Sequence, residues 1–362
     1  MEKWFSKAII TWYQENKRDL PWRHEKDAYK IWLSEIILQQ TQVAQGLSYY
    51  LKFVNKYPSI KHLAKAPEDE VLKLWQGLGY YSRARNLHAS AKMILNTYAG
   101  VFPQKHSEIK NLKGVGTYTA AAIASFAYDL PHAVVDGNVY RVLSRVFGIK
   151  TPIDSSAAKS KFQDLADQLL DKKNPAIHNQ AIMEFGSQFC KPNNPDCNAC
   201  ILNSRCFAFK TKIVSELPIK TKKAKIRKRY FNYLVLADKN KDVLIRKRQA
   251  GDIWQGLYEF KLQESEMETS QEQLFESAEF KSIVTSKFGL KYVSKQYKHI
   301  LSHQHLFAKF YVISVSKKFT KSNKPKLDTN QFTPINLKQL KAFAFPRLTG
   351  KFLEDCDLKE IL

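Results

Sequence analysis

Residues 112–127 read LKGVGTYTAAAIASFA, in which two closely spaced glycines precede an alanine-rich run. Gly114 and Gly116 suit a hairpin, and the run that follows is a strong helix former. Backbone amides exposed by glycines at a helix N-terminus bind phosphate without reading a base sequence. Taken alone, the motif also fits a plain connection between two helices, so its meaning depends on the surrounding chain.

The chain carries a large positive charge. It has 58 Lys and Arg against 34 Asp and Glu, a formal net charge of +24 over 362 residues. This excess favours a polyanionic partner, nucleic acid ahead of a membrane surface, although a merely solvating surface would explain part of it. No stretch has the apolar length of a membrane span, and the N-terminal pattern is unlike a signal peptide. We therefore expect a cytoplasmic, nucleoid-associated protein with no membrane partner.

The pattern of apolar residues changes near residue 218. Before it, apolar residues recur at helical spacing, as in VYRVLSRVF at 139–147. After it, residues 230–248 predict two strands around a polar turn, and 305–315 predict another strand. Between them, KTKKAKIRKR has seven basic residues in ten; it suits phosphates, and a solvated tether fits nearly as well. We expect three parts: an all-α domain at 1–217, a basic linker at 218–229 and a smaller α+β domain at 230–362.

Four of the five cysteines crowd into seventeen residues, CKPNNPDCNACILNSRC. In a cytosolic chain this crowding indicates metal ligation by thiolates and not a disulfide framework. Zinc and a [4Fe–4S] cluster both accept four thiolates. The uneven gaps of six, two and five residues, with a single Cys-x-x-Cys pair, favour iron and sulfur. The candidate ligands are Cys190, Cys197, Cys200 and Cys206.

Glu35 is the one carboxylate in residues 29–43, YKIWLSEIILQQTQV. In a helix, Ile31, Trp32 and Leu38 share its face, and apolar surroundings raise a carboxyl pKa. The alternative is that the Glu35 side chain reaches solvent or pairs with an Arg and has no role in catalysis.

Asp136 ends a short apolar run and precedes a helix in AVVDGNVYRVLSRVF. As a helix cap it would accept backbone hydrogen bonds and favour the helix dipole, a role that needs no catalysis. Yet few proteins share the order of glycine hairpin, Asp at the next helix start and four-Cys loop.

In this order the motifs resemble the endonuclease III superfamily of DNA glycosylases, with LKGVGTYTAAAI as the helix–hairpin–helix, Asp136 as its acidic residue and the cysteine spacing of its iron–sulfur loop. Four segments more narrowly resemble the MutY-type adenine DNA glycosylases: LPWR at 20–23, WLSEIILQQTQV at 32–43, GLGYYSRARNLH at 77–88 and VVDGNVYRVL at 134–143. Residues 230–362 are similar, more loosely, to the Nudix-like domain in which those enzymes recognise 8-oxoguanine.

The resemblance implies a monofunctional enzyme that flips out and hydrolyses off adenine opposite 8-oxoguanine or guanine in base excision repair. Bifunctional relatives carry a nucleophilic lysine where this chain has Tyr118, and tyrosine cannot form a Schiff base. Glu35 would protonate the adenine, and Asp136 would stabilise the developing sugar cation or form a transient covalent bond. Tyr118 and Asn138 would position these groups.

Further residues match the family's binding positions. The adenine pocket would use Trp22, Arg23, Leu38 and Glu184, and the wedge that holds the duplex open would use Gln40 and Tyr80, whose alternative roles are helix surface and local packing. In the second domain, Ser302 and His303 match the lesion-contacting loop, where Leu301 replaces the family's usual aromatic residue. We expect one [4Fe–4S] cluster and no nucleotide cofactor. Nucleotide hydrolysis is not expected in the second domain, because neither Gly251, Gly256 nor Gly289 begins a Gly-x5-Glu spacing and Mg²⁺ would lack its carboxylates. The partner would be duplex DNA bound by a monomer, with downstream repair proteins possible.

Two other classes stay open. A combined glycosylase and lyase would need an amine at the sugar, which Tyr118 argues against. A non-enzymatic sensor of DNA damage could use the same hairpin, cysteine loop and basic linker. Retention of both Glu35 and Asp136 favours catalysis.

Overall fold

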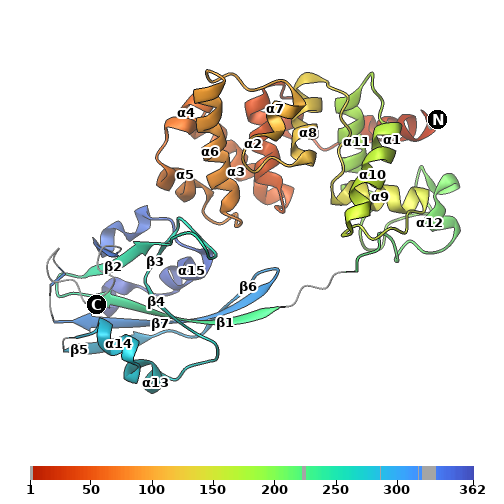
Figure 1. The fold of residues 1–362 in the computed structure, drawn as a ribbon. Coiled ribbons are helices and arrows are strands. Elements are labelled where there is room, and N and C mark those ends of the chain that lie inside the picture. Colours follow the sequence, from red (N-terminus) through yellow and green to blue (C-terminus); the bar gives the residue numbers. More distant parts are fainter. Residues whose placement is uncertain (1–2, 222–225, 286, 317, 320–331) are drawn as a thin grey trace. The chain divides into compact units, whose positions relative to one another are not determined.

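The computed structural model falls into two compact units, 1–65 with 86–223 and 66–85 with 224–362. The first unit is helical and the second is built on a β-sheet (Figure 1), which confirms the predicted order of an all-α and an α+β fold. Of the linker predicted at 218–229, residues 222–225 lie outside the described residues and Arg227 already belongs to a strand. The structure describes residues 3–221, 226–285, 287–316, 318–319 and 332–362.

Helices follow one another closely up to residue 210. Their bounds are α1 (Lys3–Asn16), η1 (Pro21–Arg23), α2 (Ala28–Leu38), α3 (Val43–Lys56), α4 (Ile60–Lys65), α5 (Glu68–Trp75), α6 (Ser82–Thr97), α7 (His106–Lys110), α8 (Thr117–Tyr128), α9 (Gly137–Phe147), α10 (Ser156–Leu169), α11 (Pro175–Gln188), η2 (Asn203–Arg205) and α12 (Phe207–Lys210).

Helix α8 lies at the centre of the first unit, in contact with α2, α7 and α11. Its alanines at 120–122 and 124 are at most 3% exposed. Because alanine has a small side chain and the highest helix propensity, this run both forms a helix and lets three neighbours approach closely. The alanine-rich motif therefore forms the centre of the core, against which α2 and α11 pack.

Helix α9 confirms the predicted periodicity. Val139, Val142, Leu143 and Val146 are all buried, so one stripe of the helix faces the core. The helix begins at Asp136, whose side chain accepts from Val139 N, and ends at Gly148 with φ 69°. On the neighbouring helix α11, a Cβ at Gly186 would lie 2.8 Å from the Asn138 Cβ, so only glycine allows the two helices to approach this closely.

The second unit contains a mixed sheet in the order β3-β2-β1-β7-β5, with β4 beside β1, β6 beside β7 and β8 beside β2. The strands predicted at 230–248 and 305–315 correspond to β1, β2 and β7. Strands β1 and β7 pair in parallel from Arg227↔Gln304 to Ala237↔Ser314. The bounds are β1 (Arg227–Ala237), β2 (Asp242–Lys247), β3 (Tyr258–Glu259), β4 (Lys261–Ser265), α13 (Gln271–Glu276), α14 (Ala278–Ile283), β5 (Phe288–Val293), β6 (Tyr297–Ile300), β7 (Gln304–Val315), β8 (Phe332–Asn336), η3 (Leu337–Ala342), α15 (Arg347–Asp355) and α16 (Leu358–Ile361).

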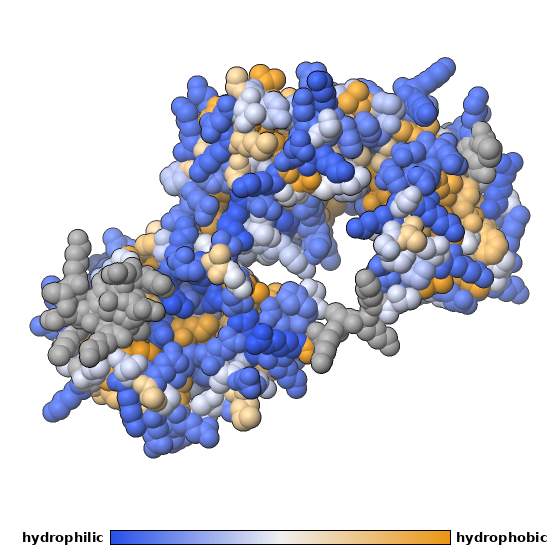
Figure 2. All heavy atoms as spheres, viewed as in Figure 1, coloured by the Kyte–Doolittle hydropathy of each residue, from blue (hydrophilic) through white to orange (hydrophobic). Residues whose placement is uncertain are grey.

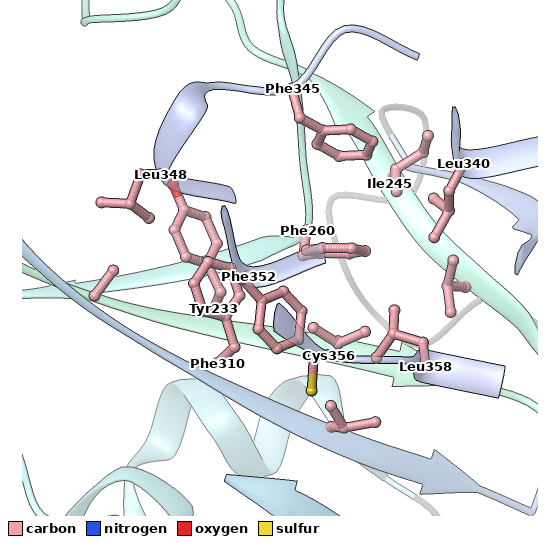
Figure 3. Packing of buried hydrophobic residues seen from close by; sticks show 14 of the residues in the cluster. Tyr233, Ile245, Phe260, Phe310, Leu340, Phe345, Leu348, Phe352, Cys356 and Leu358 are labelled. Carbon is pink, nitrogen blue, oxygen red and sulfur yellow. The ribbon is translucent and has the colours of Figure 1, made fainter. Parts of the chain in front are cut away.

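Both faces of this sheet are buried, which explains the continuous apolar run in β1. Tyr233 and Phe310 point into a cluster with Phe352 of α15, and the Phe310 and Phe352 rings stack with centroids 4.1 Å apart (Figure 3). The intervening residues, such as Leu234, face a second cluster formed with α13 and α14. Successive strand residues alternate between faces, so the two clusters hold helices on opposite sides of the sheet.

The surface in view is mostly hydrophilic, with apolar residues scattered among charged ones (Figure 2). Among the described residues, no helix is long and apolar enough to cross a membrane.

Candidate active site

A cavity of about 610 Å³ in the first unit brings together most of the predicted catalytic and substrate-binding residues. They reach it from η1, from α2 and the turn after it, and from the starts of α8 and α9 and the middle of α11. The predicted residues that line it are Trp22, Arg23, Glu35, Leu38, Gln40, Tyr118, Asp136, Asn138 and Glu184.

Glu35 lies on α2 and is 9% exposed. Burial raises its pKa to about 7, with a hydrogen bond from Tyr118 pulling the pKa down and the charge of Asp136 pushing it up. The Tyr118 hydroxyl donates to Glu35 Oε2 at 2.9 Å and also lies 3.3 Å from Met183 Sδ. Among the described residues no cation forms an ion pair with Glu35, so its apolar helix decides its protonation state.

Asp136 also faces the cavity, but it is surrounded by donors. Its Oδ1 accepts from Val139 N at 2.8 Å and its Oδ2 from Asn138 Nδ2 at 2.8 Å. Burial raises the pKa of Asp136, while these hydrogen bonds and the charge of Arg141 act in the opposite direction. Asp136 is thus both the predicted helix cap and a carboxylate exposed to the cavity.

Arg141 fixes the orientation of the Asn138 side chain. Its Oδ1 accepts from Arg141 Nη2 at 2.8 Å, which leaves its Nδ2 for Asp136. Arg141 is anchored in turn by Cys190 O at 2.8 Å and Gly186 O at 2.6 Å. The Asp136 carboxylate is therefore oriented from the cysteine loop through two side chains.

Glu184 is 2% exposed and is bound by two arginines. Arg18 Nε and Nη2 donate to it at 2.8 and 2.6 Å, and Arg23 also forms an ion pair with it. Burial alone would raise its pKa, but the hydrogen bonds from Arg18 and Arg23 outweigh burial and lower the pKa to about 2. In this structure the predicted adenine-binding carboxylate is therefore fully ionised and already paired.

Trp22 and Gln40 also line the cavity. Trp22 packs edge-on against Tyr50 with ring centroids 5.3 Å apart and is partly exposed. Gln40 is exposed and has φ 54°, a left-handed conformation that is costly for a residue other than glycine. Such strain is common at functional turns, and here it projects Gln40 at the cavity rim.

The glycine hairpin lies outside this cavity. Gly114 has φ 78°, and a Cβ there would lie 2.8 Å from the Asn86 Cβ, so glycine is required on both counts. Gly116 caps α8 with extended backbone, and a Cβ at this position would meet no atom within 4 Å. The start of α8 has no side-chain cap, which is consistent with the phosphate-binding prediction.

The four predicted cysteine ligands are free thiols and line one small cavity with Phe185, Phe189 and Leu202. Burial raises the pKa of the Cys200 thiol to about 11. Arg145 Nη1 lies 3.5 Å from Cys190 Sγ and donates to Lys191 O at 2.7 Å. Among the described residues no group of three or more His, Cys, Asp or Glu side chains is arranged to hold a single ion. The donor set nonetheless fits a thiolate-bound cluster, since four thiols share one apolar cavity.

Tyr80, Ser302 and His303 lie in the second unit and line a separate cavity of about 240 Å³. Tyr80 is 51% exposed with φ 47°, whereas its neighbour Tyr81 is 5% exposed and packs in the interior. The exposure of Tyr80 therefore fits the wedge interpretation better than local packing. Trp254 also lines this cavity, and it too has a positive φ, 63°.

Sequence reasoning missed several residues around the first cavity. Arg18 pairs with Glu184 across 166 positions, and Met183 approaches Tyr118 across 65. No local pattern marks either residue. The one signal that could have drawn attention to Met183 is its place directly before Glu184, which the resemblance assigns to the adenine pocket.

Two family models match the chain. Residues 33–168 match the HhH-GPD superfamily of base excision DNA repair proteins, and residues 232–355 match a NUDIX domain.

Relatives match most of its length. The chain is 34% identical to the adenine DNA glycosylase of Buchnera aphidicola subsp. Schizaphis graminum over 84% of each protein. It is 37% identical to that of Buchnera aphidicola subsp. Baizongia pistaciae, covering 71% of this chain and 73% of the relative.

Solved structures match the helical half. A thermostable thymine-DNA glycosylase is 31% identical with a TM-score of 0.55, covering 58% of this chain and 97% of that one. An endonuclease III in complex with DNA, 21% identical with a TM-score of 0.51 and covering 58% and 95%, shows the same fold.

Proposed function

The chain belongs to the adenine DNA glycosylase family, and we propose that it hydrolyses adenine from duplex DNA in which adenine lies opposite 8-oxoguanine or guanine. The observation that carries the proposal is one cavity that holds two carboxylates with different surroundings, Glu35 in an apolar wall and Asp136 among donors. Such a pair supports bond cleavage at a sugar, in which one group gives a proton and the other bears charge.

Glu35 supplies the proton. Adenine is a poor anionic leaving group, so its ring must be protonated before the glycosidic bond breaks. A carboxyl with a pKa of about 7 is about half protonated at neutral pH, which makes it a good general acid there. Once adenine has left, the same group, now ionised, can accept a proton from the attacking water.

Asp136 stabilises the sugar as positive charge develops at C1′, by electrostatics or by a transient covalent bond. Its hydrogen bonds from Val139 and Asn138 favour the ionised form, which this role requires. Asn138, fixed by Arg141, and Tyr118, which donates to Glu35, are positioning residues for the two carboxylates.

Adenine must leave the base stack to reach Glu35, because its glycosidic bond is inaccessible within the duplex. The cavity that would receive the adenine is lined by Trp22, Leu38, Arg23 and Glu184. Gln40, at the rim of this cavity, would fill the space that the adenine leaves in the base stack. The Gly114–Gly116 hairpin would bind a backbone phosphate at the start of α8. The excess of basic residues supports the same partner.

We assign no lyase step to the protein. Tyr118 occupies the position of the lysine nucleophile in bifunctional relatives, and here its pKa is raised well above its ordinary value by burial and by the charge of Glu35. A neutral phenol held against a carboxylate cannot form the imine that strand cleavage needs.

Ser302 and His303 are the proposed contacts to 8-oxoguanine in the second unit, where they line a cavity with the exposed Tyr80. Residues Cys190, Cys197, Cys200 and Cys206 would hold a [4Fe–4S] cluster, which would cross-link the loop that anchors Arg141. Replacement of Cys200 by Ala is expected to abolish the cluster's visible absorbance, and an unchanged spectrum would refute the cluster.

The direct test is single-turnover adenine release from duplexes with adenine opposite 8-oxoguanine, guanine or thymine, with strand breaks scored before and after alkali. We expect alkali-dependent breaks opposite 8-oxoguanine and guanine. Breaks without alkali would mean lyase chemistry, and no release from any duplex would indicate a sensor. Asp136→Asn serves as a control that is expected to bind the duplex and release no adenine.

A further inference from the structure

The turn that carries Ser302 and His303 is a tight hairpin. Ile300 of β6 pairs with His305 of β7, and Leu301 N donates to Gln304 O at 2.8 Å, so only Ser302 and His303 remain in the loop. Two-residue hairpin loops adopt a small set of turn types, which restricts the backbone of Ser302 and His303. His303 O also accepts from Arg227 N at 3.1 Å, which ties the tip to strand β1.

A hydrogen-bonded chain runs from this tip into the sheet. Ser302 Oγ lies 3.2 Å from His303 Nδ1, and His303 Nε2 lies 3.2 Å from Gln304 Nε2. Gln304 is 5% exposed, and its Oε1 lies 3.3 Å from Arg229 Nη1. The two exposed residues at the tip are thus connected to a buried guanidinium.

Arg229 decides which groups donate and which accept along these hydrogen bonds, because a guanidinium only donates. Its Nε and Nη2 donate to Glu264 at 2.7 and 2.6 Å, and Nη1 and Nη2 donate to Asp252 at 2.7 Å each. These contacts use four of its five N–H groups, and the fifth points to Gln304. Gln304 must therefore present its carbonyl oxygen to Arg229 and its amide nitrogen to His303.

The orientation of Gln304 fixes the tautomer of His303. An amide N–H₂ only donates, so His303 Nε2 has to accept, and the proton of a neutral imidazole then sits on Nδ1. His303 Nδ1 donates to Ser302 Oγ. The hydroxyl hydrogen of Ser302 is consequently free of the protein network and can be directed into the cavity.

We propose that Gln304, anchored on Arg229, is a positioning residue that fixes the His303 tautomer and makes Ser302 a hydrogen-bond donor toward the lesion base. The inference rests on the proposed function. A donor at this place selects an acceptor oxygen, and the oxygen that distinguishes 8-oxoguanine from guanine is the C8 carbonyl. Ser302 therefore reads this carbonyl, because guanine has only a C–H at C8 and its acceptor on the same edge, N7, lies at a different position.

Asp252 gives the chain its rigidity. Besides Arg229 it accepts from Arg248 Nη2 at 2.8 Å and from Ile253 N at 2.7 Å, and both arginine side chains are 7% exposed. The two guanidinium groups are buried and paired, so breaking their hydrogen bonds is costly and the orientation of Gln304 is set before DNA arrives.

The test on the unmodified protein uses nitrogen-15 NMR of its histidines in the full chain. We expect His303 to carry its proton on Nδ1, with the signal assigned by its loss in His303→Asn. A proton on Nε2 of neutral His303 would overturn the proposal without any assumption about folding.

The matched functional test measures binding to duplexes with an uncleavable 2′-fluorinated adenosine opposite 8-oxoguanine or guanine. Loss of one hydrogen bond in Gln304→Leu is expected to reduce the preference for 8-oxoguanine by about fivefold, with guanine binding within about twofold. Gln296→Leu removes an exposed glutamine that bonds only Glu268 among the described residues, and is expected to change neither.

The outcomes distinguish failure of the proposed lesion recognition from failure of the inference about Gln304. A wild-type protein without preference for 8-oxoguanine contradicts the proposed lesion recognition. A preference lost in Ser302→Ala but kept in Gln304→Leu contradicts only the inference. A third probe, 7-deaza-8-oxoguanine, keeps the C8 carbonyl and lacks the N7 hydrogen. Disappearance of the preference with this base would show that the N7 hydrogen, and not the C8 carbonyl, carries the preference, which contradicts the inference.

Discussion

Glu35 and Glu184 lie in the walls of the same cavity and are both buried, yet their pKa values move in opposite directions. Glu35 has one neutral hydroxyl donor, and burial raises its pKa to about 7. Glu184 has two guanidinium partners, and its pKa falls to about 2. The difference shows that burial alone does not decide whether a carboxylate becomes an acid catalyst; the charge of its partners does.

The same difference has opposite consequences for stability. Between pH 4.5 and about 7 the folded protein keeps Glu35 protonated, whereas the unfolded chain has released this proton. The free energy of unfolding therefore falls as pH rises through this range. Ionised Glu184 contributes stability that is present above pH 4.5 and is lost as pH falls toward 2. Each effect amounts to about 3 kcal/mol at most.

The largest expected effect comes from Glu35→Gln. Loss of the proton donor should lower single-turnover adenine release by about 10²–10⁴-fold. The same change removes a buried charge, so we expect the unfolding free energy at pH 8 to rise by up to about 3 kcal/mol relative to wild type, and by much less at pH 4.5. Denaturant unfolding at the two pH values checks this. A variant that is less stable than wild type at pH 8 would contradict the assigned environment of Glu35.

Glu184→Gln is expected to have the opposite effect on stability. It leaves Arg18 and Arg23 partly buried without a carboxylate, which should cost about 3 kcal/mol at pH 7. Chemical denaturation of the two isosteric variants side by side is the measurement. Equal effects of the same sign would show that the two carboxylates do not differ as described.

Tyr118→Phe gives the smallest change and sharpens the comparison. The phenol hydrogen bond lowers the pKa of Glu35, so its removal is expected to shift the alkaline limb of the pH–rate profile upward. The maximal rate should fall by less than about tenfold, because one neutral hydrogen bond contributes about 1 kcal/mol. A downward shift of the limb would mean that Tyr118 does not donate to Glu35.

Much of the helical half could be predicted from the sequence, because its signals are local. The period of apolar residues placed the buried stripe of α9, and an Asp before that stripe identified both the cap and the cavity carboxylate. Glu35 stood out as the single carboxylate in a largely apolar run. Motif resemblance then supplied residues such as Glu184 that no periodicity marks.

The parts that could not be predicted depend on contacts between distant positions. The ion pair of Arg18 with Glu184 and the hydrogen bond of Arg229 with Gln304 join residues 166 and 75 positions apart. Local patterning also does not show that residues 66–85 group with the second unit, since their sequence is as helical as that of their neighbours.

The pH dependence of single-turnover adenine release by the wild-type protein tests the central claim most directly. If protonated Glu35 drives the reaction, the rate opposite 8-oxoguanine stays constant below a pH of about 7 and declines about tenfold per pH unit above it. A rate that stays constant up to pH 9, with binding saturated throughout, would contradict the role of Glu35 as the acid.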